Sequence, residues 1–270
     1  MIFYFSGTGN THWAAQQIAL TTGERLLFIP EEMKGECRYE LSAGERIGFC
    51  FPVHGWQPPR LVREFIRRLH IDQLSPSEPP YVFALVTCGD SIGRTIEMLQ
   101  DELNGAGLHI DSAFSLVMPE SYVCLPFMYT DTPEREQEKI AVATKELNTY
   151  TAMILHCERG EIHTHRGLTP WTFSHVIGAY FNAYMVNDRK FTVDADCCIH
   201  CGKCQAVCPT GNLVMQPADA PSAEKLPTWQ HDGSCTCCLA CYHYCPRHAI
   251  NYGSITRKRG QYYFKGDKAL

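Results

Sequence analysis

Residues 198–213 read CIHCGKCQAVCPTGNL, and residues 235–250 read CTCCLACYHYCPRHAI. The second stretch begins 37 residues after the first, and its four spaced cysteines, the proline after the fourth and a later aliphatic residue recur at the same offset. An internal repeat of this kind predicts two copies of one structural unit. We therefore expect the C-terminal part of the chain to fold around its cysteines.

Both stretches follow the pattern Cys-x2-Cys-x2-Cys-x3-Cys-Pro. Thiolates are soft, anionic ligands that stabilise iron, and the close spacing lets one loop surround three corners of a cubic cluster. The proline then turns the chain away and removes a backbone donor. Structural zinc and disulfides are the alternatives, but zinc sites usually take paired ligands from isolated Cys-x2-Cys units. The pattern therefore favours iron–sulfur clusters over zinc.

The repeat resembles the bacterial ferredoxins that carry two clusters, in which the fourth cysteine of each run binds the cluster of the other run. The resemblance implies two [4Fe-4S] clusters in a small α+β domain. The implied ligand sets are Cys198, Cys201, Cys204 and Cys245 for the first cluster, and Cys235, Cys238, Cys241 and Cys208 for the second. Cys197 and Cys237 adjoin ligands but lie outside the register, so we interpret them as bystanders.

Five further cysteines are scattered over the N-terminal part of the chain. We expect them to be small buried hydrophobes; they are Cys37, Cys50, Cys88, Cys124 and Cys157. The first residues carry no basic leader and no cleavage site, and the later apolar segments are too short to span a bilayer. Fifteen cysteines without a secretion signal argue for a reducing compartment. The expected location is the cytoplasm, without a membrane span.

Residues 1–157 alternate short apolar runs with segments of helical spacing. The runs at residues 2–5, 26–29, 47–51, 81–86 and 113–117 predict strands, and residues 11–20, 60–69, 92–103 and 134–156 predict helices. This alternation indicates an α/β fold with a parallel sheet of about five strands, covered by helices on both faces. Ligands in such sheets bind beyond the carboxyl ends of the strands.

The first predicted strand runs into a loop rich in glycine and hydroxyl groups, before a helix. The loop consists of Ser6, Gly7, Thr8, Gly9, Asn10 and Thr11. Hydroxyls and backbone N–H groups at a helix start form a site for a phosphate dianion, and glycines let the backbone approach it closely. The loop has no lysine, no Walker spacing and no GxGxxG pattern, which argues against nucleoside triphosphates and dinucleotides. A phosphomonoester fits best, with a merely tight connection as the structural alternative.

Residues 6–11 match the whole phosphate-loop pattern Ser/Thr-x-Thr-Gly-x-Thr, and here the chain resembles the flavodoxins. The resemblance implies FMN as cofactor, with its 5′-phosphate in this loop. It also implies a five-stranded, doubly wound parallel sheet of order 2-1-3-4-5. Together with the cysteine repeat, it implies a flavodoxin–ferredoxin fusion of the kind found in anaerobes.

Two further loops and one tyrosine stand where flavodoxins hold the flavin ring. The second loop contains Pro52, Val53, His54, Gly55 and Trp56, the third contains Thr87, Cys88, Gly89, Asp90 and Gly93, and Tyr122 follows the fifth strand. By the resemblance, Trp56 stacks on the ring and Gly55 presents backbone to its N5; a proline-bounded turn with a surface aromatic is the structural alternative. His54 is either a proton donor or a hydrogen-bonded loop histidine. Ser121 stands where the fusions commonly have asparagine.

We divide the chain into a flavodoxin-like domain at residues 1–160, a linker at 161–189, a ferredoxin-like domain at 190–255 and a basic tail at 256–270. The linker carries an apolar helical stripe that we expect to be buried between the domains; it comprises Trp171, Phe173, Val176, Ile177, Tyr180, Phe181, Tyr184 and Met185. Residues 1–186 are acidic, with 14 Lys and Arg against 22 Asp and Glu, whereas residues 187–270 are mildly basic. The tail cations are expected to be solvated and not to form a docking surface; they are Arg257, Lys258, Arg259, Lys265 and Lys268.

These motifs predict an electron-transfer protein that passes electrons between two [4Fe-4S] clusters and FMN, and exchanges them with an external redox protein. The alternative is a reductase in which cluster-fed FMN reduces a small-molecule acceptor near His54, Trp56, Cys88 and Tyr122. The sequence has no catalytic acid/base pair, nucleophile constellation or nicotinamide fingerprint, so neither a catalytic residue nor a substrate follows. A non-redox scaffold or iron sensor would need an empty flavin loop, which the complete match at residues 6–11 disfavours. Nucleic-acid binding has only the basic tail in its favour.

Overall fold

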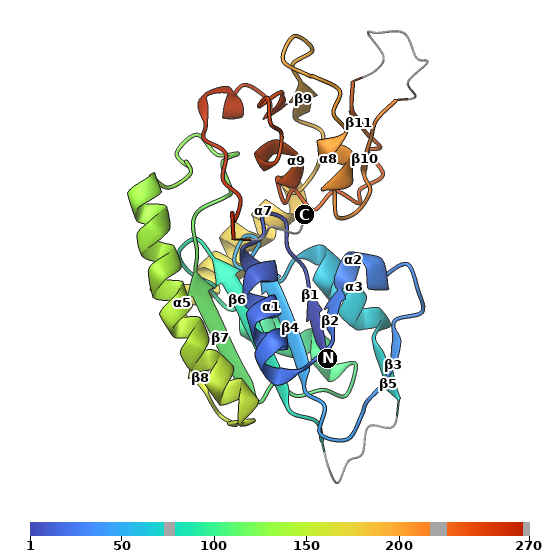
Figure 1. The fold of residues 1–270 in the computed structure, drawn as a ribbon, viewed down its shortest axis with the longest axis vertical. Coiled ribbons are helices and arrows are strands. Elements are labelled where there is room, and N and C mark those ends of the chain that lie inside the picture. The colour runs from blue at the N-terminus through green and yellow to red at the C-terminus, as the bar shows by residue number, and fades with distance from the viewer. Residues whose placement is uncertain (73–78, 217–225, 267–270) are drawn as a thin grey trace.

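The computed structural model describes residues 1–72, 79–216 and 226–266. A larger α/β unit built from the N-terminal part of the chain carries a smaller, cysteine-rich unit at one end (Figure 1). A helical segment, α6 to α7, crosses the region where the two units meet.

A six-stranded parallel sheet forms the centre of the α/β unit. Its strands are, in order across the sheet, β2 (Leu26–Phe28), β1 (Ile2–Tyr4), β4 (Ile47–Pro52), β6 (Val82–Cys88), β7 (Ser112–Val117) and β8 (Ile162–His163). Every neighbouring pair is parallel. Each of the five apolar runs forms a strand, so the predicted α/β class is confirmed. The central strands β4 and β6 are almost wholly buried, as continuous apolar runs require.

The sheet has six strands, not the five predicted. β8 escaped prediction because it has only two residues and Ile162 is 58% exposed; it becomes a strand through its pairing with β7. Since β8 lies beyond residue 160, the α/β unit is longer than the predicted first domain. A separate parallel pair, β3 (Arg38–Glu40) and β5 (His70–Asp72), was also missed, because both of its strands are mostly polar.

Helices cover both faces of the sheet, as predicted. One apolar core packs α3 (Arg60–Arg68) and α4 (Thr95–Asn104) on one face, and a second packs α1 (Asn10–Thr22) and α5 (Pro133–Leu155) on the other. A short helix, α2 (Ile29–Glu32), follows β2. These layers hold the loops at the carboxyl ends of β1, β4, β6 and β7 at one edge, beneath the cysteine-rich unit (Figure 1).

Two short antiparallel strand pairs and two helical turns build the cysteine-rich unit. The strands β9 (Phe191–Val193) and β12 (Ile250–Tyr252) pair with each other, as do β10 (Leu213–Val214) and β11 (Thr228–Trp229). The helical turns are α8 (Lys203–Ala206) and α9 (Ala240–His243), which begin 37 residues apart like the motifs that contain them. A third apolar core joins this unit to Val123 and Cys124 of the α/β unit.

The apolar stripe of the linker is only partly buried, contrary to the prediction. It lies on α6 (Pro170–Thr172), a π-helical turn (Phe173–Ile177) and α7 (Gly178–Tyr184). Trp171, Tyr180 and Tyr184 are 57%, 62% and 70% exposed, whereas Phe181 is buried. Besides Phe181, the helix packs through its smallest residues. A Cβ on Gly178 would lie 2.1 Å from the carbonyl oxygen of Gly55, so only glycine permits this approach.

The tail after residue 255 is only partly a solvated terminus. A 3-10 turn (Thr256–Lys258) begins it, and Arg257, Lys258 and Lys265 are exposed as predicted; Lys268 lies outside the described residues. Tyr262 and Phe264, however, are buried. The Phe264 N–H donates to the Thr8 carbonyl oxygen at 2.8 Å. The tail thus packs against the predicted phosphate loop.

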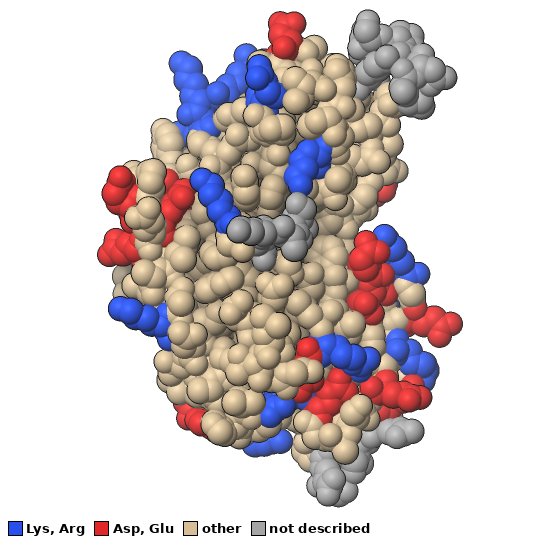
Figure 2. Space-filling model, in the orientation of Figure 1, with Lys and Arg blue, Asp and Glu red and all other residues tan. Residues whose placement is uncertain are grey.

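Charges are distributed unevenly over the surface (Figure 2). On the face shown, Lys and Arg are the main charges over the cysteine-rich unit at the top, whereas Asp and Glu are interspersed with Lys and Arg around α2 and β3 at the lower right. Among the described residues, no helix combines the length and the apolar character needed to cross a bilayer.

Candidate functional site

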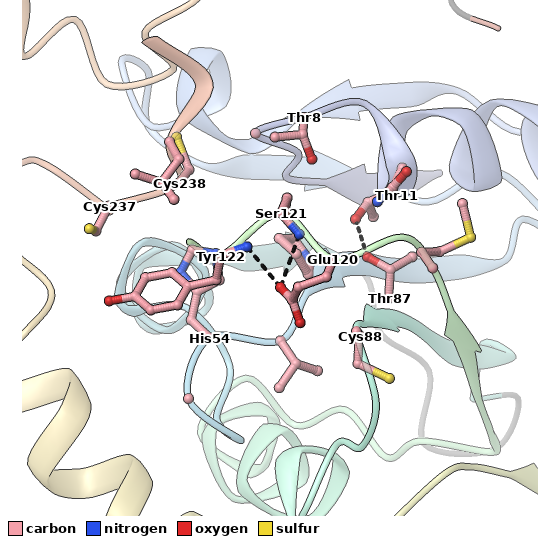
Figure 3. A pocket seen from close by; sticks show the side chains of 18 of the residues that line it. Thr8, Thr11, His54, Thr87, Cys88, Glu120, Ser121, Tyr122, Cys237 and Cys238 are labelled. Carbon is pink, nitrogen blue, oxygen red and sulfur yellow. Dashed lines mark hydrogen bonds between the residues drawn. The ribbon is translucent and has the colours of Figure 1, made fainter. Parts of the chain in front are cut away.

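A pocket lies beyond the carboxyl ends of β1, β4, β6 and β7, where α/β sheets usually bind ligands. Its empty volume is about 1190 Å³, a value that includes the solvent at its open mouth. Every residue predicted for the three flavin loops lines it except Gly9 and Gly93, and Tyr122 lines it too. The loops that the sequence singled out separately therefore come together around one space (Figure 3).

The predicted phosphate loop has a geometry suited to an anion. Gly9 has a φ of 95°, a conformation that favours glycine, and its N–H donates to Ser6 Oγ at 3.2 Å. α1 starts at the next residue without an acidic side chain in its first turn and without a side-chain cap. Its positive end is therefore available to a phosphate group. The Thr11 hydroxyl lies 2.7 Å from that of Thr87, which ties this loop to the third loop.

The second loop forms one wall, and its side chains differ from the flavodoxin expectation. The Trp56 indole N–H donates to Ser91 Oγ at 3.1 Å, and its ring packs against Phe173 at 4.6 Å between centroids. Trp56 thus already has an aromatic neighbour on the linker helix. The ring of His54 is enclosed near Phe5, and burial lowers the pKa of His54 to about 4. At neutral pH His54 is therefore uncharged.

Glu120 is a pocket residue that sequence reasoning missed. Its Oε1 accepts the N–H groups of Ser121 at 2.9 Å and Tyr122 at 2.7 Å, and the carboxylate lies among the three loops (Figure 3). Burial raises the pKa of Glu120, an effect that these hydrogen bonds and the nearby Lys139 ammonium oppose. Gly89 must be small, because a Cβ there would lie 2.1 Å from Glu120 Oε2. A glutamate in a loop gives no sequence signal of such burial.

Tyr122 offers a polar group without a protein partner. Its ring contacts Phe181 edge-on at 5.1 Å, and its buried hydroxyl has no hydrogen-bond partner among the described residues. Burial raises the pKa of Tyr122, so the phenol stays protonated. The groups that raise its pKa further are Cys237, Cys124 and Tyr252, so the hydroxyl lies against the third apolar core.

The cysteines of the two runs gather into two sets. Cys198, Cys201, Cys204 and Cys245 line one small cavity of about 350 Å³. Burial, together with the other three thiols of this set, raises the pKa of Cys204 to about 11. The neighbours that raise the pKa of Cys241 include Cys238, Cys235 and Cys208. The fourth cysteine of each run therefore lies with the other run.

These sets do not have the geometry of a single-ion site. Among the described residues, no three His, Cys, Asp or Glu side chains converge closely enough to hold one metal ion. A zinc ion would bring its thiolates to about 2.3 Å from one centre, whereas a four-iron cluster takes each thiolate on a different iron.

The backbone repeats along with the cysteines. Positive φ angles occur at His200, Gly202 and Gly211, and again 37 residues later at Cys237, Leu239 and His248. The hydrogen bond from Val207 N to the Lys203 carbonyl recurs from Tyr244 N to Ala240 at the same offset. Non-glycine residues rarely adopt such angles, so the second run keeps the loop shape of the first against local preference.

The second run also forms part of the pocket wall. Thr236, Cys237, Cys238 and Leu239 line the same pocket as the phosphate loop. A Cβ on Gly7 would lie only 2.7 Å from Cys238 Cβ, so the two loops are in close contact. His243 strengthens the junction: its Nε2 donates to the Ser121 carbonyl at 2.6 Å, and its Nδ1 accepts the Tyr262 N–H at 3.0 Å.

The cysteines outside the two ligand sets are mostly buried, as predicted. Cys37, Cys50, Cys88 and Cys124 are buried, and Cys157 is partly exposed. Burial raises the pKa of Cys88 to about 12, which keeps this pocket thiol neutral. Cys237 is not an isolated bystander, because its thiol makes a hydrogen bond with that of Cys124 and the contact raises its pKa. Cys197 is partly exposed.

Residues 191–214 match the family described as the 4Fe-4S binding domain. The matched range includes Cys198, Cys201, Cys204 and Cys208, the whole first run. The chain therefore contains a ferredoxin-type iron–sulfur domain for at least one [4Fe-4S] cluster, joined to a parallel-sheet α/β unit. Such a domain indicates iron–sulfur electron transfer and implies a redox partner. Comparison with curated proteins and with solved structures gave no match.

Proposed function

We propose that this protein is an iron–sulfur flavoprotein that transfers electrons between two [4Fe-4S] clusters, FMN and an external redox protein. One observation carries the proposal: the loop of the second cysteine run lines the same pocket as the three loops expected to hold FMN. A fold that separated these elements would give electrons no direct route between them. The close contact of Gly7 with Cys238 supports a junction built for transfer within one molecule.

The chain's own residues divide the work of holding the groups. Ser6, Thr8 and the start of α1 bind the phosphate, and the loops around Gly55 and Gly89 flank the ring. Uncharged His54 leaves the second loop without a cation. When bound, FMN supplies one- and two-electron chemistry, and each cluster supplies one-electron transfer. Buried Cys237 and Leu239 exclude water from the junction.

The second cluster is supported by the repetition of both ligands and backbone. The family match covers only the first run, but three positive φ angles and the helical turns recur at the same offset in the second. The exchange of Cys208 and Cys245 between the two thiol sets agrees with the ligand crossing that the ferredoxin resemblance implies.

The test is anaerobic purification followed by an ultraviolet–visible spectrum and quantitation of iron, sulfide and flavin. We expect about eight iron atoms and one FMN per chain. Rapid mixing with a low-potential reductant should then reduce the flavin at a rate that does not change with protein concentration. Zinc in place of iron would refute the clusters, and iron without flavin would refute the pocket's assignment.

A second candidate function is a cluster-fed reductase of a small-molecule acceptor. Glu120 favours it, because a buried carboxyl with a raised pKa in the pocket is a group that exchanges protons with a bound acceptor. Steady-state turnover of a quinone or nitro compound that falls in Glu120→Gln, while flavin content is unchanged, would support this candidate. If the flavin is reduced efficiently within the molecule but no acceptor is turned over, only the electron-carrier function remains.

A further inference from the structure

The helical segment at residues 170–184 turns an apolar surface toward solvent. Six side chains make up what we call the apolar helix face: Leu168, Trp171, Val176, Ile177, Tyr180 and Tyr184. Their exposed fractions run from 43% at Ile177 to 100% at Leu168. Leu168 lies just before the helix, and the other five side chains lie on it. The rings of Tyr180 and Tyr184 are 5.0 Å apart, so these two side chains form a continuous aromatic surface.

The other side of the helix packs against the second loop through apolar, small and polar residues. Phe181 is buried against Tyr122, and Phe173 packs on Trp56. The Gln57 side-chain amide donates to the Ser174 carbonyl at 2.7 Å, and Asn182 donates to the His54 carbonyl at 3.0 Å. An amphipathic helix usually keeps its apolar residues toward the core, whereas this one carries large apolar side chains on its packed side and on its exposed side. Large exposed apolar patches of this kind mark interaction sites.

The area of the face is that of a stable protein interface. Its three aromatic side chains are each more than half exposed. With about 150–250 Å² per aromatic side chain and comparable aliphatic contributions, the face exposes on the order of 700 Å². The largest apolar patch of a monomer is usually about 300–600 Å², whereas a standard interface takes about 800 Å² from each partner.

The apolar helix face carries no acidic or basic side chains, and this indicates what kind of partner it fits. Residues 167–187 contain no Asp, Glu, Lys or Arg. Docking of transient redox partners is steered by complementary charges, and helices that lie on membranes carry Lys and Arg beside their apolar side. When two copies of the same uncharged face pair, no like charges come together and no charge is left without a countercharge. Two-fold dimers, which pair one patch with itself, are the commonest oligomers.

We propose that two copies of this chain form a dimer through the apolar helix face, around a two-fold axis. The inference does not depend on FMN, since it rests on the helix and its exposed side chains alone. The dimer covers Trp171, Tyr180 and Tyr184.

The test is sedimentation of the full chain, purified anaerobically and kept in reductant, over a range of concentrations. We expect a mass twice the 30.6 kDa of one chain. Tyr180→Glu places a charge in the interface and should weaken dimerisation at least about 30-fold, as loss of an interface anchor does. The matched control is Leu20→Glu on α1, where the side chain is 75% exposed and the dimer should persist. Iron content and circular dichroism report folding of both variants.

A measurement on the unaltered chain covers the case in which Tyr180→Glu does not fold. Amide hydrogen exchange over residues 170–187 should then slow as the protein concentration rises. A mass of one chain at every concentration would overturn the proposal, as would equal dimerisation of the two variants. Flotation with phosphatidylcholine vesicles that Tyr180→Glu abolishes, without a dimer, would assign the face to lipid instead.

Discussion

The two cysteine runs share their spacing and their backbone but not their surroundings. Cys201 of the first run is exposed to solvent, whereas its counterpart in the second run, Cys238, lies against Gly7 of the phosphate loop. The first set lines a cavity bordered by its own unit, and the second run lines the pocket of the α/β unit. Runs with the same cysteine spacing and backbone shape thus occupy an outward and an inward position.

The two cysteine runs therefore differ in their position in the fold and not in the spacing of their cysteines. Under the proposed function, the outward run meets the external redox partner and the inward run meets the flavin pocket. The inward run is held there by His243, whose counterpart 37 residues earlier is the exposed Ala206. The four predictions that follow test this asymmetry.

The largest effect is expected from removing one thiolate of each run. Cys201→Ala and Cys238→Ala should each lower the iron content by about four atoms per chain, because a cluster that lacks a ligand is lost. With a small reductant that reaches both runs, Cys201→Ala should retain rapid flavin reduction and Cys238→Ala should lose it. Rapid-mixing absorbance of the flavin is the measurement. Equal rates in the two variants would break the distinction between outward and inward runs.

A smaller effect is expected from a methyl group placed between the two units. Gly7→Ala puts a Cβ 2.7 Å from Cys238 Cβ, which forces the loops apart and should cost about 1–3 kcal/mol of unfolding free energy. Gly35→Ala is the control, since its Cβ would meet only the Glu32 carbonyl at 3.5 Å. Urea denaturation of the two variants measures the difference. A Gly7→Ala variant as stable as its control would mean that the junction is loose.

His54, on the pocket side of the inward run, should make the stability of the protein sensitive to acid. The pKa of His54 is lowered by burial to about 4, so between about pH 6.5 and 4 the unfolded chain binds a proton that the folded chain does not. Stability is therefore full above the ordinary histidine pKa and is lost as the pH falls toward 4. His54→Gln should remove about 1–3 kcal/mol of that loss, as measured by urea denaturation at pH 7 and pH 5. Replacement of the exposed His109 by Gln should leave that loss of stability unchanged. The prediction would be contradicted if the two variants lost equal stability between pH 7 and pH 5.

The smallest effect is expected at the unpaired hydroxyl of Tyr122. Tyr122→Phe removes a buried polar group that has no hydrogen-bond partner among the described residues, so the free energy of unfolding of the flavin-free protein should rise by about 1 kcal/mol. Urea denaturation of the variant and of the unaltered chain measures the difference. A loss of stability would show that the hydroxyl has a partner in the native protein.

Strands and loops differ in how far the sequence predicted them. The buried strands were predicted because each carries its own apolar run, whereas β8 and the β3–β5 pair exist through pairing with neighbours. The flavin loops were found by motif, but Glu120 was not, since a carboxylate's burial depends on what surrounds it. The stripe at residues 171–185 was recognised as apolar and wrongly expected to be buried. Amphipathic spacing says which side of a helix is apolar, not which side meets the core.

By itself, the sequence determined the features that depend on short-range spacing: the two cysteine runs, the glycine-rich turn before α1 and the βα alternation. Spacing along a loop dictates which ligands surround a cluster, so no tertiary information was needed for them. Only the tertiary structure decided that Cys238 lies against Gly7, that Phe264 packs beside the phosphate loop and that Tyr180 faces solvent. These contacts join residues far apart in the chain, and they follow from how whole elements pack.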